Sequence, residues 1–354
     1  MDWWFDPLRT YEDNVECGPF GAFAVQQEFS EPGSEPREAF MRHPVHRPFG
    51  VAAGPLPTAR HCAGAFRHGF DVNVYKTVRT RAVPAHPFPN TLAVRVPGDL
   101  AANSGVTLVA DGDFETATSI SNSYGVPSCD PDQWQPDMAA AAAAARDGQV
   151  LVGSCQGTRD GSDADLVADY ARAALLVSET GAGAVELNLS CPNEGAGTLL
   201  CFDTPLVATI ADAAKERIGD VPLVLKIAYF RDDDALARLV RAVGPLVNGI
   251  AAINTLPARL VDAEGRPALP GPGRETAGVC GTSIRWAGLD MVRRLTRHRE
   301  AGRHEFGIVG VGGVMTAEDY RTYRAAGADA VMTATGAMLD AELGRAIRAS
   351  LVSR

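Results

Sequence analysis

The chain has 354 residues, 46% of them hydrophobic, which is enough to bury the core of one large domain. Its formal net charge is −10, and we find no basic patch, which argues against a nucleic-acid partner because phosphate binding needs a concentrated basic surface. The seven cysteines form no CxxC pair and no histidine stands at metal-ligand spacing, so we expect no metal site. With no secretory signal pattern and no run of about 18 apolar residues, we expect no membrane segment and a cytoplasmic location.

Residues 1–48 are rich in proline, glutamate, glycine and aromatic residues and show no sustained periodicity. We therefore interpret this stretch as an N-terminal extension. The remaining residues, 49–354, are predicted to form one α/β domain.

Eight short apolar runs alternate with longer amphipathic stretches after residue 48. The expected strands are FGVAAG, FDVNVYK, QVLVGS, AVELNLS, PLVLKIA, GIAAIN, FGIVGVGG and DAVMTAT. Helical spacing of apolar residues is present at 163–179, 204–218, 232–243, 283–296 and 317–326. An open doubly wound sheet would alternate in the same way, but polar and glycine residues directly after the strands favour a closed (β/α)8 TIM barrel with its chemistry at the C-terminal rim.

One connection, residues 77–148, is far longer than the others and separates the second expected strand from the third. Loops of this length are usually functional. We expect this insertion to fold over the barrel mouth as a lid, with an alanine-rich helix from about residue 135 to 145.

Two small-residue turns lie one βα unit apart near the C-terminus, IVGVGGVMT and TATGAM. Backbone amides at glycine turns bind phosphate, and barrels place such a site after strands seven and eight. A lone pair such as Gly312 and Gly313 equally well makes a simple tight turn. The repetition at barrel spacing favours phosphate binding.

Polar side chains gather at the expected strand ends. Cys191 stands between Asn188 and Asn193 on a rim loop, where a thiol can act as a base. Lys76 and Lys226 each end an apolar strand and suit electrostatic contact with an electron-rich ring. Asn122, Asn188, Asn193 and Asn254 form a set of four amides, which suits the alternating N–H and C=O edge of a pyrimidinedione, although each alone is an ordinary turn residue.

From about residue 49 onward these motifs resemble the dihydroorotate dehydrogenase family. The segments VAAGPLPT, VYKTVRT, NSYGVPS, ELNLSCPN, VLKIA, INT, TAGVCGTSIR, VGVGGVMT and TATGAM occur in the family's order. The resemblance implies an FMN-dependent TIM barrel that oxidises L-dihydroorotate to orotate in pyrimidine biosynthesis. Cys191 would remove the C5 proton, and flavin N5 would accept the C6 hydride.

The resemblance also assigns site residues. Those implied to contact FMN are Ala52, Ala53, Gly54, Lys76, Thr77, Asn122, Asn188, Lys226, Ile253, Gly281, Gly312, Gly313, Thr335 and Gly336. Those implied to contact the substrate are Lys76, Asn122, Tyr124, Gly125, Val126, Asn188, Asn193, Asn254 and Thr255.

A cysteine base resembles the soluble branch of the family, so we favour a homodimer that passes electrons to a small soluble acceptor such as fumarate. The chain has no cysteine cluster of its own for an iron–sulfur centre, and a partner subunit that carries one stays an open alternative. Two other functions also stay open. One is a related FMN oxidoreductase that acts on another dihydropyrimidine or cyclic amide in secondary metabolism. The other is a barrel that binds a phosphorylated ligand without redox chemistry.

Overall fold

The computed structural model describes residues 3–25, 35–102, 105–190 and 199–352. Its centre is an eight-stranded parallel sheet in the order β3-β15-β14-β11-β10-β9-β8-β4. The strands are β3 (Phe49–Val51), β4 (Val72–Val78), β8 (Val150–Cys155), β9 (Ala184–Asn188), β10 (Leu223–Ile227), β11 (Gly249–Ala252), β14 (Gly307–Val311) and β15 (Ala330–Thr333). Each overlaps one of the eight apolar runs, with β4 and β8 extending one or two residues past theirs, so the predicted TIM barrel is confirmed.

The two ends of this sheet, β3 and β4, approach each other closely enough to bring the sheet round into a barrel. The Asp71 amide donates to the Phe49 carbonyl over 2.8 Å, and the Val51 amide donates to the Asn73 side chain over 3.2 Å. A side chain at Gly50 would overlap the Val72 backbone, so glycine is required for this approach.

Small and β-branched side chains fill the inside of the barrel. Alternate residues of each strand point inward, as the two-residue period of a strand requires. The inner cluster contains Phe40, Val45, Ala52, Val72, Val74, Val150, Val152, Ala184, Val224, Ala251, Val309, Val311, Ala330 and Met332. The lower part of the barrel is therefore a packed apolar plug, and polar chemistry is confined to the C-terminal ends of the strands.

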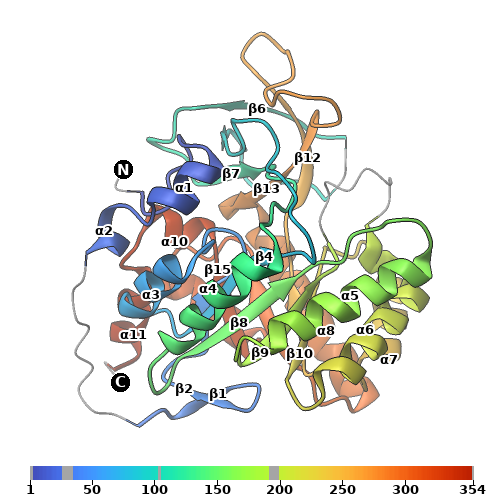
Figure 1. Ribbon diagram of the computed structural model, residues 1–354. Helices are drawn as coiled ribbons and strands as arrows, with labels where there is room; N and C mark the ends of the chain where they lie inside the picture. Colours follow the sequence, from blue (N-terminus) through green and yellow to red (C-terminus); the bar gives the residue numbers. More distant parts are fainter. Residues whose placement is uncertain (1–2, 26–34, 103–104, 191–198, 353–354) are drawn as a thin grey trace.

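Helices surround the barrel, as Figure 1 shows for α5 to α8 on one side. The helices that the sequence predicted are α5 (Asp163–Ser178), α6 (Thr204–Ile218), α7 (Asp233–Val243), α8 (Arg285–Gly302) and α9 (Ala317–Ala325). The alanine-rich helix α4 (Pro131–Ala143) begins earlier than expected, because Pro131 is accepted in the first helical turn, where its missing N–H needs no partner. The sequence did not predict α3 (Ala59–Arg67), α10 (Thr335–Leu339) or α11 (Leu343–Val352).

A second, smaller barrel of five strands lies above the C-terminal ends of the main strands (Figure 1). Its strands are β5 (Ala93–Val94), β6 (Thr107–Asp111), β7 (Ser119–Asn122), β12 (Leu256–Val261) and β13 (Thr276–Gly281). The first three come from the long insertion, and the last two come from the connection between β11 and β14. The insertion is thus not a lid of loops alone, because a second segment of the chain pairs with it.

The N-terminal segment covers both ends of the main barrel. The hairpin of β1 (Glu38–Phe40) and β2 (His43–Val45) lies at the bottom in Figure 1 and inserts Phe40 and Val45 into the inner cluster. At the other end lies α1 (Tyr11–Cys17), and the Trp4 indole donates to the Ala337 carbonyl over 2.7 Å, while α2 (Gly21–Ala24) packs against α3 through Phe23. None of the helices in the described ranges is both long and apolar enough to cross a membrane.

Candidate active site

A cavity opens at the C-terminal ends of the barrel strands. The predicted site residues that line it are Ala53, Gly54, Lys76, Thr77, Asn122, Tyr124, Gly125, Val126, Asn188, Lys226, Asn254, Thr255 and Thr335. They come from both the main barrel and the small one, so the fold brings together residues that are up to about 280 positions apart in the sequence. One site therefore holds most of the predicted residues.

The floor of the cavity is charged. Lys226 on β10 is 6% exposed, and its ammonium donates no hydrogen bond to any described residue. Burial lowers the pKa of Lys226, and the nearby Glu186 carboxylate opposes this shift. Burial raises the pKa of Glu186, and Lys226 and a hydrogen bond from Ser154 oppose that rise. A buried cation that opens onto a cavity is suited to an anionic or electron-rich ligand.

The sequence analysis missed Glu186. It stands two residues before Asn188 in an apolar strand, and the two-residue period of a strand puts both side chains on the inner face. The sequence signal that could have identified Glu186 is an acidic residue on the inner face of a strand, at the end where the barrel opens.

Amide side chains form a connected group at one side of the cavity. The Asn254 amide donates to the Ser190 hydroxyl over 3.1 Å and lies 3.4 Å from the Asn188 side-chain oxygen. The Asn188 amide in turn donates to the Gln156 side chain over 2.9 Å. The Tyr170 hydroxyl donates to the Asn188 carbonyl over 2.8 Å and fixes the end of β9. These contacts hold two of the predicted asparagines in set orientations before any ligand binds.

An irregularity in β4 allows two consecutive residues to face the cavity. The pairing of β4 with β8 shifts register between Tyr75 and Val78. As a result Lys76 and Thr77 both line the cavity, where a regular strand would turn one of them outward. The Thr77 hydroxyl lies 3.0 Å from the Ser154 hydroxyl.

Three glycine turns meet at one end of the site. Gly281, Gly312 and Gly313 have φ angles of 103°, 128° and 66°, which favour glycine. A Cβ at Gly313 would lie 2.8 Å from the Gly281 carbonyl oxygen, so the turns after β13 and β14 are in direct contact. A Cβ at Gly336 would overlap the Val314 carbonyl, which joins the turn after β15 to the same group. The glycines themselves do not line the cavity, but the adjoining Thr335 does.

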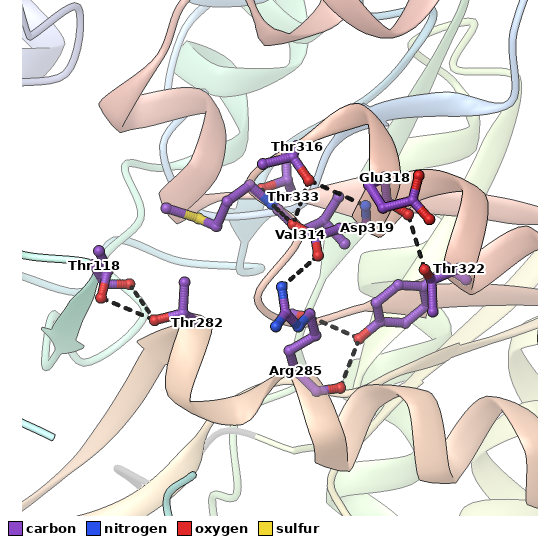
Figure 2. Close-up of polar contacts among 12 residues, drawn as sticks. Thr118, Thr282, Arg285, Val314, Thr316, Glu318, Asp319, Thr322 and Thr333 are labelled. Carbon is purple, nitrogen blue, oxygen red and sulfur yellow. Dashed lines mark hydrogen bonds and ion pairs between the residues drawn. The ribbon is translucent and has the colours of Figure 1, made fainter. Parts of the chain in front are cut away.

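A network of hydrogen bonds links residues that adjoin these turns (Figure 2). Arg285, the first residue of α8, pairs with Asp319 of α9. Asp319 accepts hydrogen bonds from the Met315 amide and the Thr316 hydroxyl, each over 3.0 Å. The Thr333 hydroxyl donates to the Val314 carbonyl over 2.7 Å. The Arg285 guanidinium is thus bonded to Asp319. The groups at this end that can contact a ligand are the backbone amides and Thr335.

The insertion and the N-terminal segment close the outer side of the cavity. Tyr124, Gly125 and Val126 follow β7 and line it, and the Tyr124 ring packs against Phe5 and Tyr11 at centroid distances of 6.1 and 6.0 Å. No function was predicted for residues 1–48, and neither Phe5 nor Tyr11 was expected at the cavity. An extension without periodicity gives no sequence signal of the surface against which it packs.

Further cavity residues come from the same elements. Those that the sequence analysis did not single out are Phe5, Tyr11, Pro55, Thr91, Ile120, Ser121, Glu186, Cys280, Ala334 and Met338. Several are apolar, and burial raises the pKa of the Cys280 thiol to about 11, so that thiol stays neutral at physiological pH. The cavity therefore has an apolar part beside its amide-rich part.

Some predicted site residues are not at the cavity wall. Ala52 lies in the inner barrel cluster, and Ile253 packs in the main core, beside Gly312. Cys191 and Asn193 lie outside the described residues, so the predicted base and one predicted amide stay predictions. Ser190, directly before Cys191 in the sequence, is 1% exposed and bonded to Asn254.

Comparison with known sequences gives consistent results. The dihydroorotate dehydrogenase family profile matches residues 113–352. The chain is 31% identical over 350 residues to a dihydroorotate dehydrogenase of Dictyostelium discoideum, covering 95% of this chain and 94% of that protein. It is 30% identical over 169 residues to the catalytic subunit of dihydroorotate dehydrogenase B (NAD(+)) of Shouchella clausii, covering 48% of this chain and 53% of that protein.

Solved structures show the same fold. The ligand-free DHODH of Eimeria tenella superposes with a TM-score of 0.74 at 18% identity, covering 93% of this chain and 90% of that chain. The DHODH of the same organism in complex with ferulenol gives a TM-score of 0.70 at 17% identity, covering 88% and 82%.

Proposed function

Because the chain belongs to the dihydroorotate dehydrogenase family, whose members are oxidoreductases acting on CH–CH groups, we propose that it oxidises L-dihydroorotate to orotate with FMN, as a step of pyrimidine biosynthesis. The observation that carries this proposal is one cavity that joins an amide group and a buried lysine, with a set of glycine turns next to its Thr335 wall. Family membership sets aside the non-redox alternative.

The residues present fit a flavin. The Lys226 ammonium is buried, opens onto the cavity and bonds to no described residue, so it is available to the edge of a ring that gathers negative charge on reduction. Asn188, Lys76 and Thr77 would contact the same ring from neighbouring strands, and Ala53 and Gly54 leave space for it to approach the backbone. The apolar wall around Ile120 and Met338 suits the hydrocarbon part of the ring system.

The glycine turns suit the phosphate group of FMN. Gly281, Gly313 and Gly336 have no side chain that would cover the backbone amides, and φ at the first two favours glycine. The hydroxyl of Thr335 lines the cavity beside them. Since Arg285 is paired with Asp319, we infer that backbone amides supply most of the phosphate contacts.

The amide group suits the substrate ring. Asn122, Asn188 and Asn254 each offer one donor and one acceptor group, which match the N–H and C=O groups of a dihydropyrimidinedione. Lys76, Thr255 and the backbone of residues 124–126 would complete the contacts, the latter near the substrate carboxylate. Asn193 would be a fourth amide, and it lies outside the described residues.

Proton removal is assigned to Cys191. In this proposal its thiolate takes the C5 proton of dihydroorotate, and the asparagines hold the ring so that C5 faces the sulfur. When bound, FMN would supply the two-electron acceptor for the hydride that leaves C6. The loss of one proton and one hydride converts dihydroorotate to orotate.

For assembly and electron transfer we propose a homodimer that uses a small soluble acceptor in the cytoplasm. Support comes from the resemblance of a cysteine base to the soluble branch of the family. Size-exclusion chromatography with light scattering tests the dimer. Turnover assays with fumarate, quinone and NAD(+) test the acceptor.

The experiment that tests the proposed reaction is an anaerobic titration of the purified protein with L-dihydroorotate, followed through the absorbance of oxidised flavin. Bleaching supports the substrate and the cofactor together. A colourless protein that cannot be reconstituted with FMN would contradict the cofactor. A yellow protein that dihydroorotate does not bleach would contradict the substrate.

The second candidate function is oxidation of another cyclic amide in secondary metabolism. It is favoured by the wall that Phe5, Tyr11 and Tyr124 build at the outer side of the cavity, because this wall shapes the region that admits substrate. Bleaching by a different dihydropyrimidine, with dihydroorotate inert, would select this function.

A further inference from the structure

The floor of the cavity contains a carboxylate to which the proposed reaction gives no role. Glu186 is 2% exposed and is the only acid among the described residues that line the cavity. Its Oε1 atom is buried without a hydrogen-bond partner among those residues. An unpaired buried carboxylate oxygen is costly, so its retention at this position needs a reason.

Strand register places Glu186 diagonally across the ladder from Lys226. Glu186 pairs with Val224, and Lys226 pairs with Asn188, in the parallel ladder of β9 and β10. Both charged side chains line the cavity, directly above the apolar cluster that includes Ala184 and Val224. Charges interact strongly in such surroundings because little water screens them.

The flavin would respond to the sum of these two charges. An ammonium group alone would favour the reduced ring, which carries more negative charge than the oxidised ring. A carboxylate near the ammonium cancels part of this preference for the reduced ring. It also keeps the lysine charged, because an opposite charge opposes the fall in the pKa of Lys226 that burial causes.

We propose that Glu186 is a positioning residue that acts through Lys226: its carboxylate offsets part of the charge of the ammonium at the cavity floor, and the two charges together set the reduction potential of the bound flavin. This inference rests on the proposed function only in requiring that the cavity binds FMN.

The test is the midpoint potential of bound FMN in Glu186→Gln at pH 7, measured by equilibration with a redox dye. The variant removes the negative charge and keeps the shape of the side chain. We expect a positive shift equal to at least a tenfold rise in the two-electron reduction constant, about 30 mV. A constant within twofold of the wild-type value, or a negative shift, would overturn the inference.

A second variant covers the case in which Glu186→Gln does not fold. Glu186→Asp keeps the charge but reaches less far, so we expect a positive shift smaller than the one from a lost charge. An unchanged potential in Glu186→Asp then counts against the inference.

Asp71→Asn is the matched control, because Asp71 is also a buried acid with a raised pKa but pairs with Arg348 away from the cavity. It should change stability and leave the potential of FMN unaltered. A shift in Asp71→Asn as large as that in Glu186→Gln would show a general effect of lost charge and would reject the specific role.

The two proposals fail in different ways. A wild-type protein that binds no FMN contradicts the proposed function. A wild-type protein that binds FMN, with an unchanged potential in the Glu186 variants, contradicts only the role of Glu186.

Discussion

The Asn254 side chain, beyond the end of β11, donates a hydrogen bond to the Ser190 hydroxyl, beyond the end of β9, over 3.1 Å. This bond ties the loop that begins after Ser190 to a strand two places away in the barrel. Since Cys191 follows Ser190 directly, the bond fixes the start of the segment that carries the proposed base.

Ser190→Ala should therefore slow flavin reduction without releasing FMN. A lost hydrogen bond of this kind costs about 1 kcal/mol, which corresponds to a rate about fivefold lower if the cost falls on the transition state. Stopped-flow absorbance measures the reduction rate. The matched control is Thr209→Ala, which removes a helix hydroxyl bonded only to its own helix and should leave the rate unchanged. Equal rates in both variants would show that the Ser190 bond does not position the base.

If Cys191 is the base, Cys191→Ala should retain bound FMN and lose flavin reduction by dihydroorotate. Cys191→Ser should be slow but active, since serine is a poorer base in a site suited to thiolate. In the wild type the reduction rate should rise with pH toward the pKa of a thiol, about 8.5 when unperturbed. Stopped-flow traces across pH 6–10 provide the profile, and a fully active alanine variant would remove Cys191 from the mechanism.

Gly313→Ala should weaken FMN binding at least tenfold. The added Cβ would lie 2.7 Å from the Arg285 Cβ and 2.8 Å from the Gly281 carbonyl oxygen, so the turns must separate. Fluorescence titration of the apoprotein with FMN measures the affinity. Gly273→Ala is the matched control, because Gly273 has a similar φ of 74° but nothing within 4 Å of the added Cβ. Comparable losses of affinity in the two variants would point to backbone strain and away from a phosphate site.

Phe5→Ala should both destabilise the protein and release FMN faster. Phe5 is 3% exposed and lines the cavity beside Tyr124, and truncating a buried phenylalanine costs about 3 kcal/mol or more. Urea denaturation measures the free energy of unfolding, and flavin fluorescence measures the release rate. Leu8→Ala, at a side chain that is 58% exposed in the same segment, should change neither quantity. An unaltered release rate in Phe5→Ala would indicate that the segment does not enclose the flavin.

Stability should depend on pH through Asp71. Burial raises the pKa of Asp71 to about 6, despite the opposing effect of Arg348. Because the folded-state pKa lies above the unfolded value, the folded protein binds the proton more tightly, and the stability that this provides is lost as pH rises through about 6. Relative to Asp71→Asn, the wild type should therefore lose about 2 kcal/mol of unfolding free energy between pH 4 and pH 7. Urea unfolding at a series of pH values tests this, and parallel curves for the two proteins would contradict it.

The sequence alone determined the main barrel and most of the cavity wall. Each strand carries a continuous apolar run, and a buried parallel strand needs little else to be recognised. Lys76, Asn188 and Lys226 were found for the same reason, since a polar residue at the end of such a run must face the C-terminal rim, where all the strands end together.

Tertiary structure decided the remaining features. The small barrel forms only because β12 and β13 meet strands of the insertion more than 130 residues earlier, and short strands of two to six residues have too little pattern to predict such pairing. Phe5 and Tyr11 join the cavity wall through packing of an aperiodic segment. The relative positions of Glu186 and Lys226 depend on the register of β9 with β10. This register places two residues that are each unremarkable in the sequence in one site of low dielectric constant.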